Sequence, residues 1–274
     1  MDLRTKLDVI YSDGGVETNY SAEAQDFSRD NFQATMTTDD FIYVGFRKPV
    51  NALYVAMEVV NTINSSLSFE YYGPLGWKSL TVSDDTKALQ RNGFMTWERV
   101  DDSEEVAVAG KTQHWVRIAA DDDIDPVTFQ AINLILADDN DIRQEVPALI
   151  DDCFYPSGQT SHLLQHVATK NYILSRLKYK QYIKYNSTTG DQNINEWDIL
   201  DIYEFRQAAV YHVIAQIYLG LSDDPEDTYW AKYDEYMKKF DQAFVNGLTT
   251  IDTDDDGEVD QVEKRQIKSV RWAR

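Results

Sequence analysis

Phe41-Ile-Tyr-Val-Gly-Phe46 and Ala52-Leu-Tyr-Val-Ala-Met57 are short runs rich in aromatic and β-branched residues, and the turn sequence Arg47-Lys-Pro-Val-Asn51 separates them. Runs of the same character follow at residues 66–72, 112–118 and 127–136. Turns containing Gly, Pro, Asn and Asp lie between these runs, and no helical pattern interrupts them. Strands at this spacing predict an antiparallel β-sandwich for the first half of the chain.

The second half of the chain has a helical pattern. Apolar residues recur every four positions in a helix expected over about residues 196–221, and another helix is expected over about 160–185. Asp224-Pro-Glu-Asp227 has the composition of a helix start, with Asp224 as the N-cap and Pro225 at the first helical position. The helix that it opens carries one aromatic side, formed by Tyr229, Tyr233, Tyr236, Met237, Phe240 and Phe244.

Together these patterns predict an α+β protein of two domains. The N-terminal antiparallel β-sandwich would span residues 1–138, of which 1–35 are a possible arm. The C-terminal helical bundle would span residues 139–274; its first part, about 139–153, is expected to be helical, with Pro147 interrupting that helix or beginning a new turn. The acid-rich segment Asp121-Asp-Asp-Ile-Asp125 is a candidate hinge near the join.

A calcium-binding loop is predicted near the end of the chain, in Asp252-Thr-Asp-Asp-Asp-Gly-Glu-Val-Asp-Gln-Val-Glu263. Its oxygen donors fall at positions 1, 3, 5, 7, 9 and 12 of an EF-hand-like loop, and Gly257 stands at position 6, where the chain turns sharply. The expected ligands are Asp252, Asp254, Asp256, the backbone carbonyl of Glu258, Asp260 and a bidentate Glu263. Since no His or Cys lies nearby, the donor set indicates Ca²⁺ and not zinc or copper.

Composition limits the classes of function. The net charge of −21 makes tight nucleic-acid binding improbable, because such a surface repels phosphate backbones. No apolar run is long enough to cross a membrane, and the first residues lack the apolar stretch of a signal peptide. Cys153 is the single cysteine, which excludes an internal disulfide framework, and we expect it to be buried as a small apolar residue.

The sequence does not support an enzyme. It contains no glycine-rich phosphate loop and no nucleophile motif, and carboxylates are too common for an acid–base pair to stand out. His162 and His166 have a spacing that two ligands on one helix face can share, but they lack the intervening glutamate of metalloproteases. We expect these two histidines to be exposed polar residues of a helix, in preference to a zinc site.

The aromatic residues of the β half allow two interpretations. Tyr71, Tyr72, Trp77, Trp97 and Trp115 would form a sugar-stacking platform if their rings reached the surface. Aromatic residues at alternating strand positions are more often part of a core, and we favour that interpretation.

The helical half resembles the head–tail connector adaptor proteins of tailed bacteriophages. The resemblance rests on Trp197-Asp-Ile-Leu-Asp-Ile-Tyr203, on the run from Ala208 to Tyr218, on the Tyr- and Trp-rich helix after Asp224, on the late calcium loop, and on the ending Ser269-Val-Arg-Trp-Ala-Arg274. The β half resembles a sandwich module of phage structural proteins, through Tyr43-Val-Gly-Phe46, Phe69-Glu-Tyr-Tyr72 with Gly76-Trp77, and His114-Trp-Val-Arg-Ile118.

This resemblance implies a structural virion protein, made in the host cytoplasm and located at the neck of the particle. The helical bundle would form a homo-oligomeric ring, usually of twelve copies, beneath the portal protein and around the DNA channel. DNA would pass close to an acidic wall without binding tightly. The sandwich is an addition to the smallest members of the family, and we expect it to face outward, as decoration or as a docking site for other neck proteins.

The basic C-terminal tail, residues 264–274, is expected to dock onto the portal or a neighbouring subunit. Its candidate contact residues are Arg265, Lys268, Arg271, Trp272 and Arg274. A tail folded back on its own bundle is the alternative. Two rival functions remain: a calcium-dependent adhesion or carbohydrate-binding protein that uses the sandwich, and a calcium-responsive helical sensor, for which the five methionines are too scattered.

Overall fold

The computed structural model describes residues 7–25, 31–156, 160–179, 199, 203–224 and 226–247. The chain divides into two compact units, residues 1–134 and 135–274. The first contains two antiparallel sheets and the second contains helices, so the α+β class predicted from the sequence is confirmed. The division after Leu134 lies four residues before the boundary expected at 138.

The larger sheet of the β unit has seven strands, in the order β2-β1-β4-β11-β6-β7, with β10 paired to β11. Every pairing in it is antiparallel. Its strands are β1 (Asp8–Asp13), β2 (Val16–Asn19), β4 (Phe41–Phe46), β6 (Leu67–Gly73), β7 (Gly76–Ser79), β10 (Glu105–Val108) and β11 (Lys111–Ala120).

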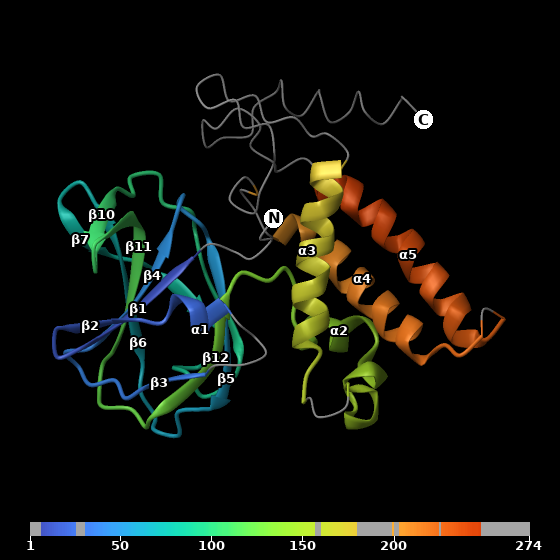
Figure 1. Cartoon of the computed structure of the whole chain (residues 1–274), viewed down its shortest axis with the longest axis horizontal. Coiled ribbons are helices and arrows are strands. Elements are labelled where there is room, and N and C mark those ends of the chain that lie inside the picture. The colour runs from blue at the N-terminus through green and yellow to red at the C-terminus, as the bar shows by residue number, and fades with distance from the viewer. Residues whose placement is uncertain are drawn as a thin grey trace, which may run out of the picture. The chain divides into compact units, whose positions relative to one another are not determined.

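The smaller sheet has five strands, in the order β3-β12-β5-β9-β8, again antiparallel throughout. Figure 1 shows the two sheets as two layers of the β unit, with the short helix α1 (Ser21–Gln25) beside them. The strands of this sheet are β3 (Phe32–Ala34), β5 (Ala52–Val59), β8 (Val82–Asp84), β9 (Gly93–Trp97) and β12 (Val127–Asn133).

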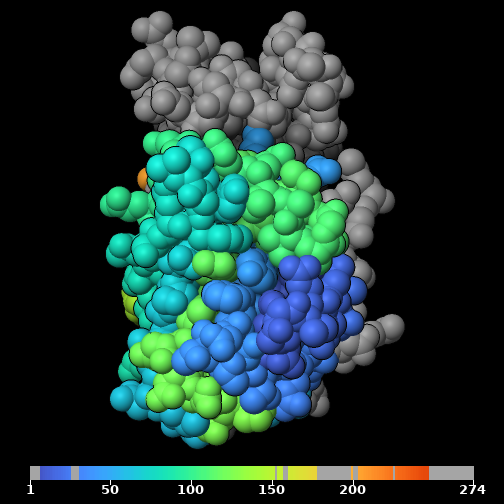
Figure 2. Space-filling view, turned by 90° about the vertical axis from the view of Figure 1, so that its left-hand side faces the viewer, coloured from blue at the N-terminus to red at the C-terminus, as the bar shows by residue number. Residues whose placement is uncertain are grey.

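Residues 1–35 were expected to be a possible arm, but the described part of this segment contributes strands to both sheets. From Leu7 onward, β1 pairs with β4 and β3 pairs with β12. Val9 and Ile10 are completely buried, so this segment supplies core residues, which an arm would not do. In Figure 2 these early residues, in blue, share one flank of the β unit with green and teal segments from much later in the chain.

Alternation along β4 and β11 separates the two faces of the larger sheet. Val44 is paired with Val116 and Ile42 with Ile118, and all four side chains are buried. The residues that alternate with these four along the strands belong to the opposite face of the sheet. On that face Trp115 is 1% exposed. There Trp115 packs with Ile10 and Val108 and donates its indole N–H to the carbonyl of Val106 at 2.9 Å. The β10 hairpin therefore gives this sheet a small second core on its other face.

The helical unit contains four α-helices and two 3₁₀ turns among its described residues. They are α2 (Asp139–Glu145), η1 (Pro147–Ile150), η2 (Asp152–Phe154), α3 (Leu163–Tyr179), α4 (Tyr203–Leu221) and α5 (Thr228–Gly247). Pro147 begins a new turn, one of its two predicted roles. The core is formed by fully buried side chains of α3, α4 and α5, among them Leu177, Val213, Phe205, Phe240 and Phe244. None of the described helices is both long and apolar enough to span a membrane.

The predicted N-cap of α5 and the predicted burial of Cys153 are wrong. The N-cap of α5 is Asp227 and not Asp224, because Asp227 accepts a hydrogen bond from the backbone N–H of Trp230 at 2.6 Å. Asp224 instead closes the turn before the helix, where its carboxylate accepts from the backbone N–H of Glu226. Cys153, expected to be buried, lies in the short turn η2 and is exposed.

Gly45 in β4 provides a test of the packing around Trp115. A methyl group at this position would lie 2.7 Å from the Trp115 ring, which is too close for any real contact. We expect Gly45→Ala to lower the free energy of unfolding of the β unit by about 1–3 kcal/mol, the usual result of overpacking a core. Calorimetric melting of the full chain would measure it.

The matched control is Gly220→Ala in α4, where an added methyl group meets nothing within 4 Å. Alanine is the better helix former, so this change should leave the stability unchanged or raise it by up to about 1 kcal/mol. Equal effects of the two substitutions would contradict the packing described for Trp115.

Candidate functional site

The metal-binding and docking residues that were predicted from the sequence lie outside the described part of the chain. This applies to the predicted calcium ligands, Asp252, Asp254, Asp256, Glu258, Asp260 and Glu263. It applies equally to the predicted docking residues, Arg265, Lys268, Arg271, Trp272 and Arg274. Among the residues that are described, no group of three or more His, Cys, Asp or Glu side chains is placed to hold a metal ion.

The proposed sugar-stacking platform is only partly at the surface. Tyr71, Trp97 and Trp115 are buried, and only Tyr72 and Trp77 remain half-exposed. Their rings meet edge-on across β6 and β7, with centroids 5.5 Å apart. The guanidinium of Arg117 lies 4.4 Å from the centre of the Trp77 ring. A sugar would need an open ring face to stack on, and the protein's own arginine covers one.

Arg117 also explains why this group of rings is ordered. It lies 4.6 Å from the centre of the Phe41 ring and pairs with the Glu70 carboxylate at 2.6 Å. Phe41, Glu70 and Trp77 come from three different strands, so one cation joins β4, β6 and β7 to its own strand β11. The core interpretation of the aromatic residues accounts for most of this face.

A buried polar network fixes the start of the helical unit. Asp138 is the N-cap of α2, and its carboxylate accepts hydrogen bonds from the backbone N–H groups of Asn140 and Asp141. The Asp141 carboxylate accepts from the N–H of Asp138 in return, and it also pairs with Arg206 of α4 at 2.6 Å. Burial and the neighbouring Asp141 charge raise the pKa of Asp138. The cap of α2 is thereby tied to α4.

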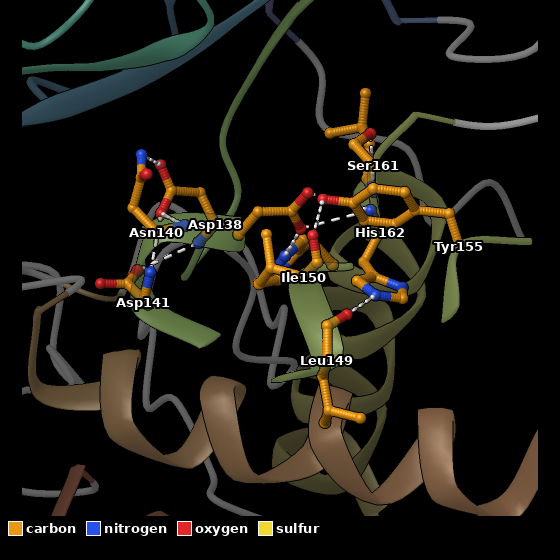
Figure 3. A network of polar contacts seen from close by, with 11 residues as sticks. Asp138, Asn140, Asp141, Leu149, Ile150, Tyr155, Ser161 and His162 are labelled. Carbon is orange, nitrogen blue, oxygen red and sulfur yellow. Dashed lines mark hydrogen bonds and ion pairs between the residues drawn. The ribbon is translucent and has the colours of Figure 1, made fainter. Parts of the chain in front are cut away.

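His162 and His166 are buried, at 0% and 3% exposure, so the prediction that they are exposed is wrong. Figure 3 shows the His162 ring directed at the carbonyl of Leu149 in η1, at 2.9 Å from its Nε2 atom. That carbonyl can only accept, so Nε2 carries the proton and donates. His166 Nε2 lies 3.0 Å from the Asp139 carboxylate. The i,i+4 spacing gives both rings one helix face, and that face joins α3 to α2 and η1.

His212 makes the corresponding contact between α3 and α4. Its Nδ1 atom lies 2.8 Å from the hydroxyl of Thr169, and its ring stacks on Tyr172 with centroids 4.2 Å apart. Burial, together with the nearby positive charge of Arg176, lowers the pKa of His212 to about 4. Burial also lowers the pKa of His162. The neutral imidazoles of His162 and His212 therefore join the start of α3 to η1 and the body of α3 to α4.

Apolar exposure is concentrated on this helical unit. Six of the ten large hydrophobic side chains that are exposed among the described residues belong to it, namely Leu164, Tyr172, Tyr203, Leu219, Tyr229 and Trp230. Single exposed apolar side chains are common on protein surfaces, so only those that lie together are relevant to a contact surface.

Three of these side chains lie where α4 ends and α5 begins, and we call them, with the two tyrosines beside them, the aromatic end. Leu219, Tyr229 and Trp230 are 36%, 41% and 37% exposed. Tyr218 stacks on Tyr229 at 6.2 Å, and Trp230 packs on Tyr233 at 5.3 Å. The sequence places Tyr229 and Tyr233 on the aromatic side of this helix, together with Phe240 and Phe244, and does not indicate that the Tyr229 end is exposed. Helical periodicity alone does not show where the packing partner of a helix stops.

A groove of about 540 Å³ lies between α2 and α4 of the same unit. Asp141, Glu145, Tyr203 and Arg206 are among the residues in its walls. It mixes both signs of charge with an exposed tyrosine, a composition suited to the rim of a protein interface.

Comparison with known proteins gives no family. No protein-family model matches the chain, and no curated protein matches it. Among solved structures, the chain is similar to chitosan-binding module 1 of a chitosanase/glucanase from Paenibacillus sp. IK-5, with 12% identity and a TM-score of 0.29 over 48% of this chain and 97% of that one.

Two further structures match with lower scores. The CBM32 of AlyQ, in complex with 4,5-unsaturated mannuronic acid, has 11% identity and a TM-score of 0.24, over 38% of this chain and 74% of its own. A pectin-binding carbohydrate-binding module has 12% identity and a TM-score of 0.24, over 40% and 76%. At this level of likeness, the ligands of these modules are not transferred to this chain.

The buried histidines predict a pH dependence of stability. In the unfolded chain His212 titrates near pH 6.5, whereas in the folded protein its pKa is about 4. The unfolded state therefore binds more protons between these values, and stability falls as the pH is lowered from about 6.5 to about 4. The slope from this one group approaches about 1.4 kcal/mol per pH unit.

Denaturant unfolding of the helical signal at several pH values would measure this slope. His212→Asn should lower the stability at pH 7 and give a shallower dependence, because the contribution of His212 is removed while that of His162 remains. Parallel curves for the two proteins would contradict the assignment.

Proposed function

We propose that the protein is a structural head–tail connector, or neck adaptor, of a tailed bacteriophage, and that its helical unit assembles as a ring beneath the portal. The observation that carries the proposal is the aromatic end, because an isolated subunit leaves its Leu219, Tyr229 and Trp230 partly exposed to water, at 36–41%. The order of sequence motifs described above is the other support.

The geometry of the helical unit suits a ring subunit. Copies around a closed ring use two different patches of one subunit, and each patch must keep its shape for the ring to close. The Asp141–Arg206 pair and the three buried histidines fix α2, α3 and α4 relative to one another. Tyrosine and tryptophan are the residues that interfaces use most as anchors.

The charge of the protein fits a wall of the DNA channel. A net charge of −21 on 274 residues repels the phosphate backbone. A channel wall must let DNA slide past, so we infer that DNA passes the ring without tight binding. The remaining partners in this proposal are the portal, other neck proteins and further copies of the chain, as a dodecamer.

The proposal also assigns roles to the end of the chain. The loop with Asp252 and Glu263 would bind Ca²⁺, and the tail with Trp272 would dock onto the portal; both rest on the sequence alone. The β unit would face away from the channel. The rival proposal, a calcium-dependent adhesion or carbohydrate-binding protein, requires retention on glycans and does not require a portal.

Attachment to portal-bearing phage heads tests the ring proposal. Wild-type protein should add a ring to the portal vertex, seen by negative-stain microscopy and by co-sedimentation with the heads. Trp230→Ser should weaken attachment by about 30-fold or more, since interface tryptophans commonly contribute about 2 kcal/mol or more. Deletion of residues 269–274 should abolish attachment and leave the helical spectrum unchanged.

The control for Trp230→Ser is Leu75→Ser, which removes an even more exposed side chain, 93% accessible, from the β6–β7 turn of the other unit. It should attach like the wild type. Attachment of Trp230→Ser at wild-type strength would refute the role of the aromatic end. Failure of the wild type to bind any portal-bearing head would refute the connector proposal itself.

Calcium binding is tested by thermal unfolding with calcium and with a chelator. A ligand that binds only the native state raises the melting temperature by mass action, so calcium should stabilise the wild type by roughly 2–3 kcal/mol at 100 times its dissociation constant. Glu263→Gln should remove most of this gain, because it deletes the bidentate ligand. Magnesium should substitute poorly. Identical melting curves with calcium and chelator would rule the site out.

A further inference from the structure

The β unit contains a hollow that the connector proposal does not use. Its volume is about 610 Å³, within the range of roughly 300–1,000 Å³ typical of small-molecule sites. It opens beside β6, β7 and β8, with residues of the loops that flank them in its walls. We call it the serine-lined hollow, after the hydroxyl side chains that border it.

The polar side chains of the hollow retain hydrogen-bonding capacity. Asn64, Ser68, Ser79, Thr81 and Lys87 line it, and within the described part of the chain none of these five side chains makes a hydrogen bond. All five are exposed to solvent. Hydroxyl and amide groups can each donate and accept, so together they match a ligand that does the same.

One wall of the hollow has a strained backbone. Lys87, Ala88 and Leu89 are three consecutive non-glycine residues in the left-handed region, with φ of 52°, 56° and 64°. Each such residue costs on the order of 1 kcal/mol, and strain of this kind is concentrated at binding sites. The strained turn places Lys87 and Ala88 in the wall of the hollow.

A second set of contacts maintains this strain. The Asp84 carboxylate accepts from the N–H groups of Thr86 and Ala88, both at 2.8 Å. Asn61, 1% exposed, donates its side-chain amide to the Ala88 carbonyl at 3.0 Å, and its backbone N–H to the Leu89 carbonyl at 2.9 Å. A buried asparagine and a carboxylate with both oxygens engaged thus hold one turn in an unfavourable conformation.

The chemistry of the hollow selects the class of ligand. Its charged groups are one cation, Lys87, and one anion, Asp84, whose oxygens already accept hydrogen bonds. An anionic ligand would lack further cations and would meet a protein of net charge −21. Phe69 and Leu80, both buried, supply an apolar floor for the C–H face of a ring.

We infer that the serine-lined hollow binds a neutral, hydroxyl-rich ligand, an oligosaccharide of hexopyranose units. The hydroxyls of Ser68, Ser79 and Thr81 and the amide of Asn64 bind the sugar hydroxyls, and Lys87 donates from the strained turn. Asn61 is a positioning residue that acts through the turn. This inference does not depend on ring assembly, and it places the sugar at this hollow and not at the Tyr72–Trp77 rings.

The test uses the full chain with maltohexaose, cellohexaose and mannohexaose as neutral probes, and with oligogalacturonate as a charged one. Saturation-transfer NMR detects binding, and titration calorimetry gives the affinity. At least one neutral probe should bind, and the charged probe should bind at least tenfold more weakly. Absence of binding by all three neutral probes at millimolar concentration overturns the inference, as does preference for the charged one.

Variants locate the site. Ser79→Tyr fills the hollow from an exposed position and should weaken binding at least tenfold, whereas Ser83→Tyr, exposed on the adjoining strand β8 and outside the lining, should change it less than twofold. Unchanged binding by Ser79→Tyr overturns the site.

Trp77→Ala should leave binding unchanged, and a loss of binding by this variant would move the site to the aromatic rings. Portal attachment of Ser79→Tyr should equal that of the wild type, which separates this inference from the connector proposal.

Discussion

The carboxylate of Asp141 is the interaction on which the helical unit depends. It accepts the N–H of the Asp138 cap and pairs with Arg206, so that the beginning of α2 and one side of α4 share a single buried group. A carboxylate that is 7% exposed needs such partners, because an unpaired buried charge is strongly destabilising. The aromatic end lies at the opposite end of α4 from Arg206, and contacts between α4 and α5, such as that of Tyr218 with Tyr229, hold it.

In the β unit the equivalent constraint is that the polar side chain of the buried Asn61 must have hydrogen-bond partners. Its amide donates to carbonyls of Ile63 and Ala88 and to the hydroxyl of Ser65, and its own carbonyl accepts from Ile63. Two loops far apart in sequence are thereby held at one end of the sheets. The strain in residues 87–89 is tolerated there because surrounding hydrogen bonds determine the conformation completely.

Local sequence patterns predicted five of the twelve described strands, namely β4, β5, β6, β11 and β12, but not their partners. The runs at 41–46 and 52–57 became β4 and β5 of two different sheets, although they are neighbours in sequence. Residues 8–34 lack a clear pattern, and long-range pairing with β4 and β12 makes them strands. The burial of His162 and His166 was missed for the same reason. Polar residues on a helix are expected in water unless their partners, here Leu149 and Asp139, can be foreseen.

The two candidate sites also differ in whether the sequence could predict them. A calcium loop could be predicted because its expected ligands lie within twelve residues of the sequence, at the spacing of an EF-hand-like loop. The serine-lined hollow could not, because Ser68, Ser79 and Lys87 belong to separate segments, and serine has no distinctive spacing. The sequence Lys87-Ala88-Leu89 likewise does not indicate that these three residues adopt left-handed backbone conformations.

The strands at the ends of both sheets are short. β2 and β7 have four residues each, and β3 and β8 have three. An open sheet edge is a template on which a second chain can add a strand, and short edge strands offer few unpaired N–H and C=O groups for this. Many copies crowded around one axis would bring such edges close together. With edges this short, neighbouring β units can be packed densely and still remain separate bodies, free to present their outer faces independently of one another.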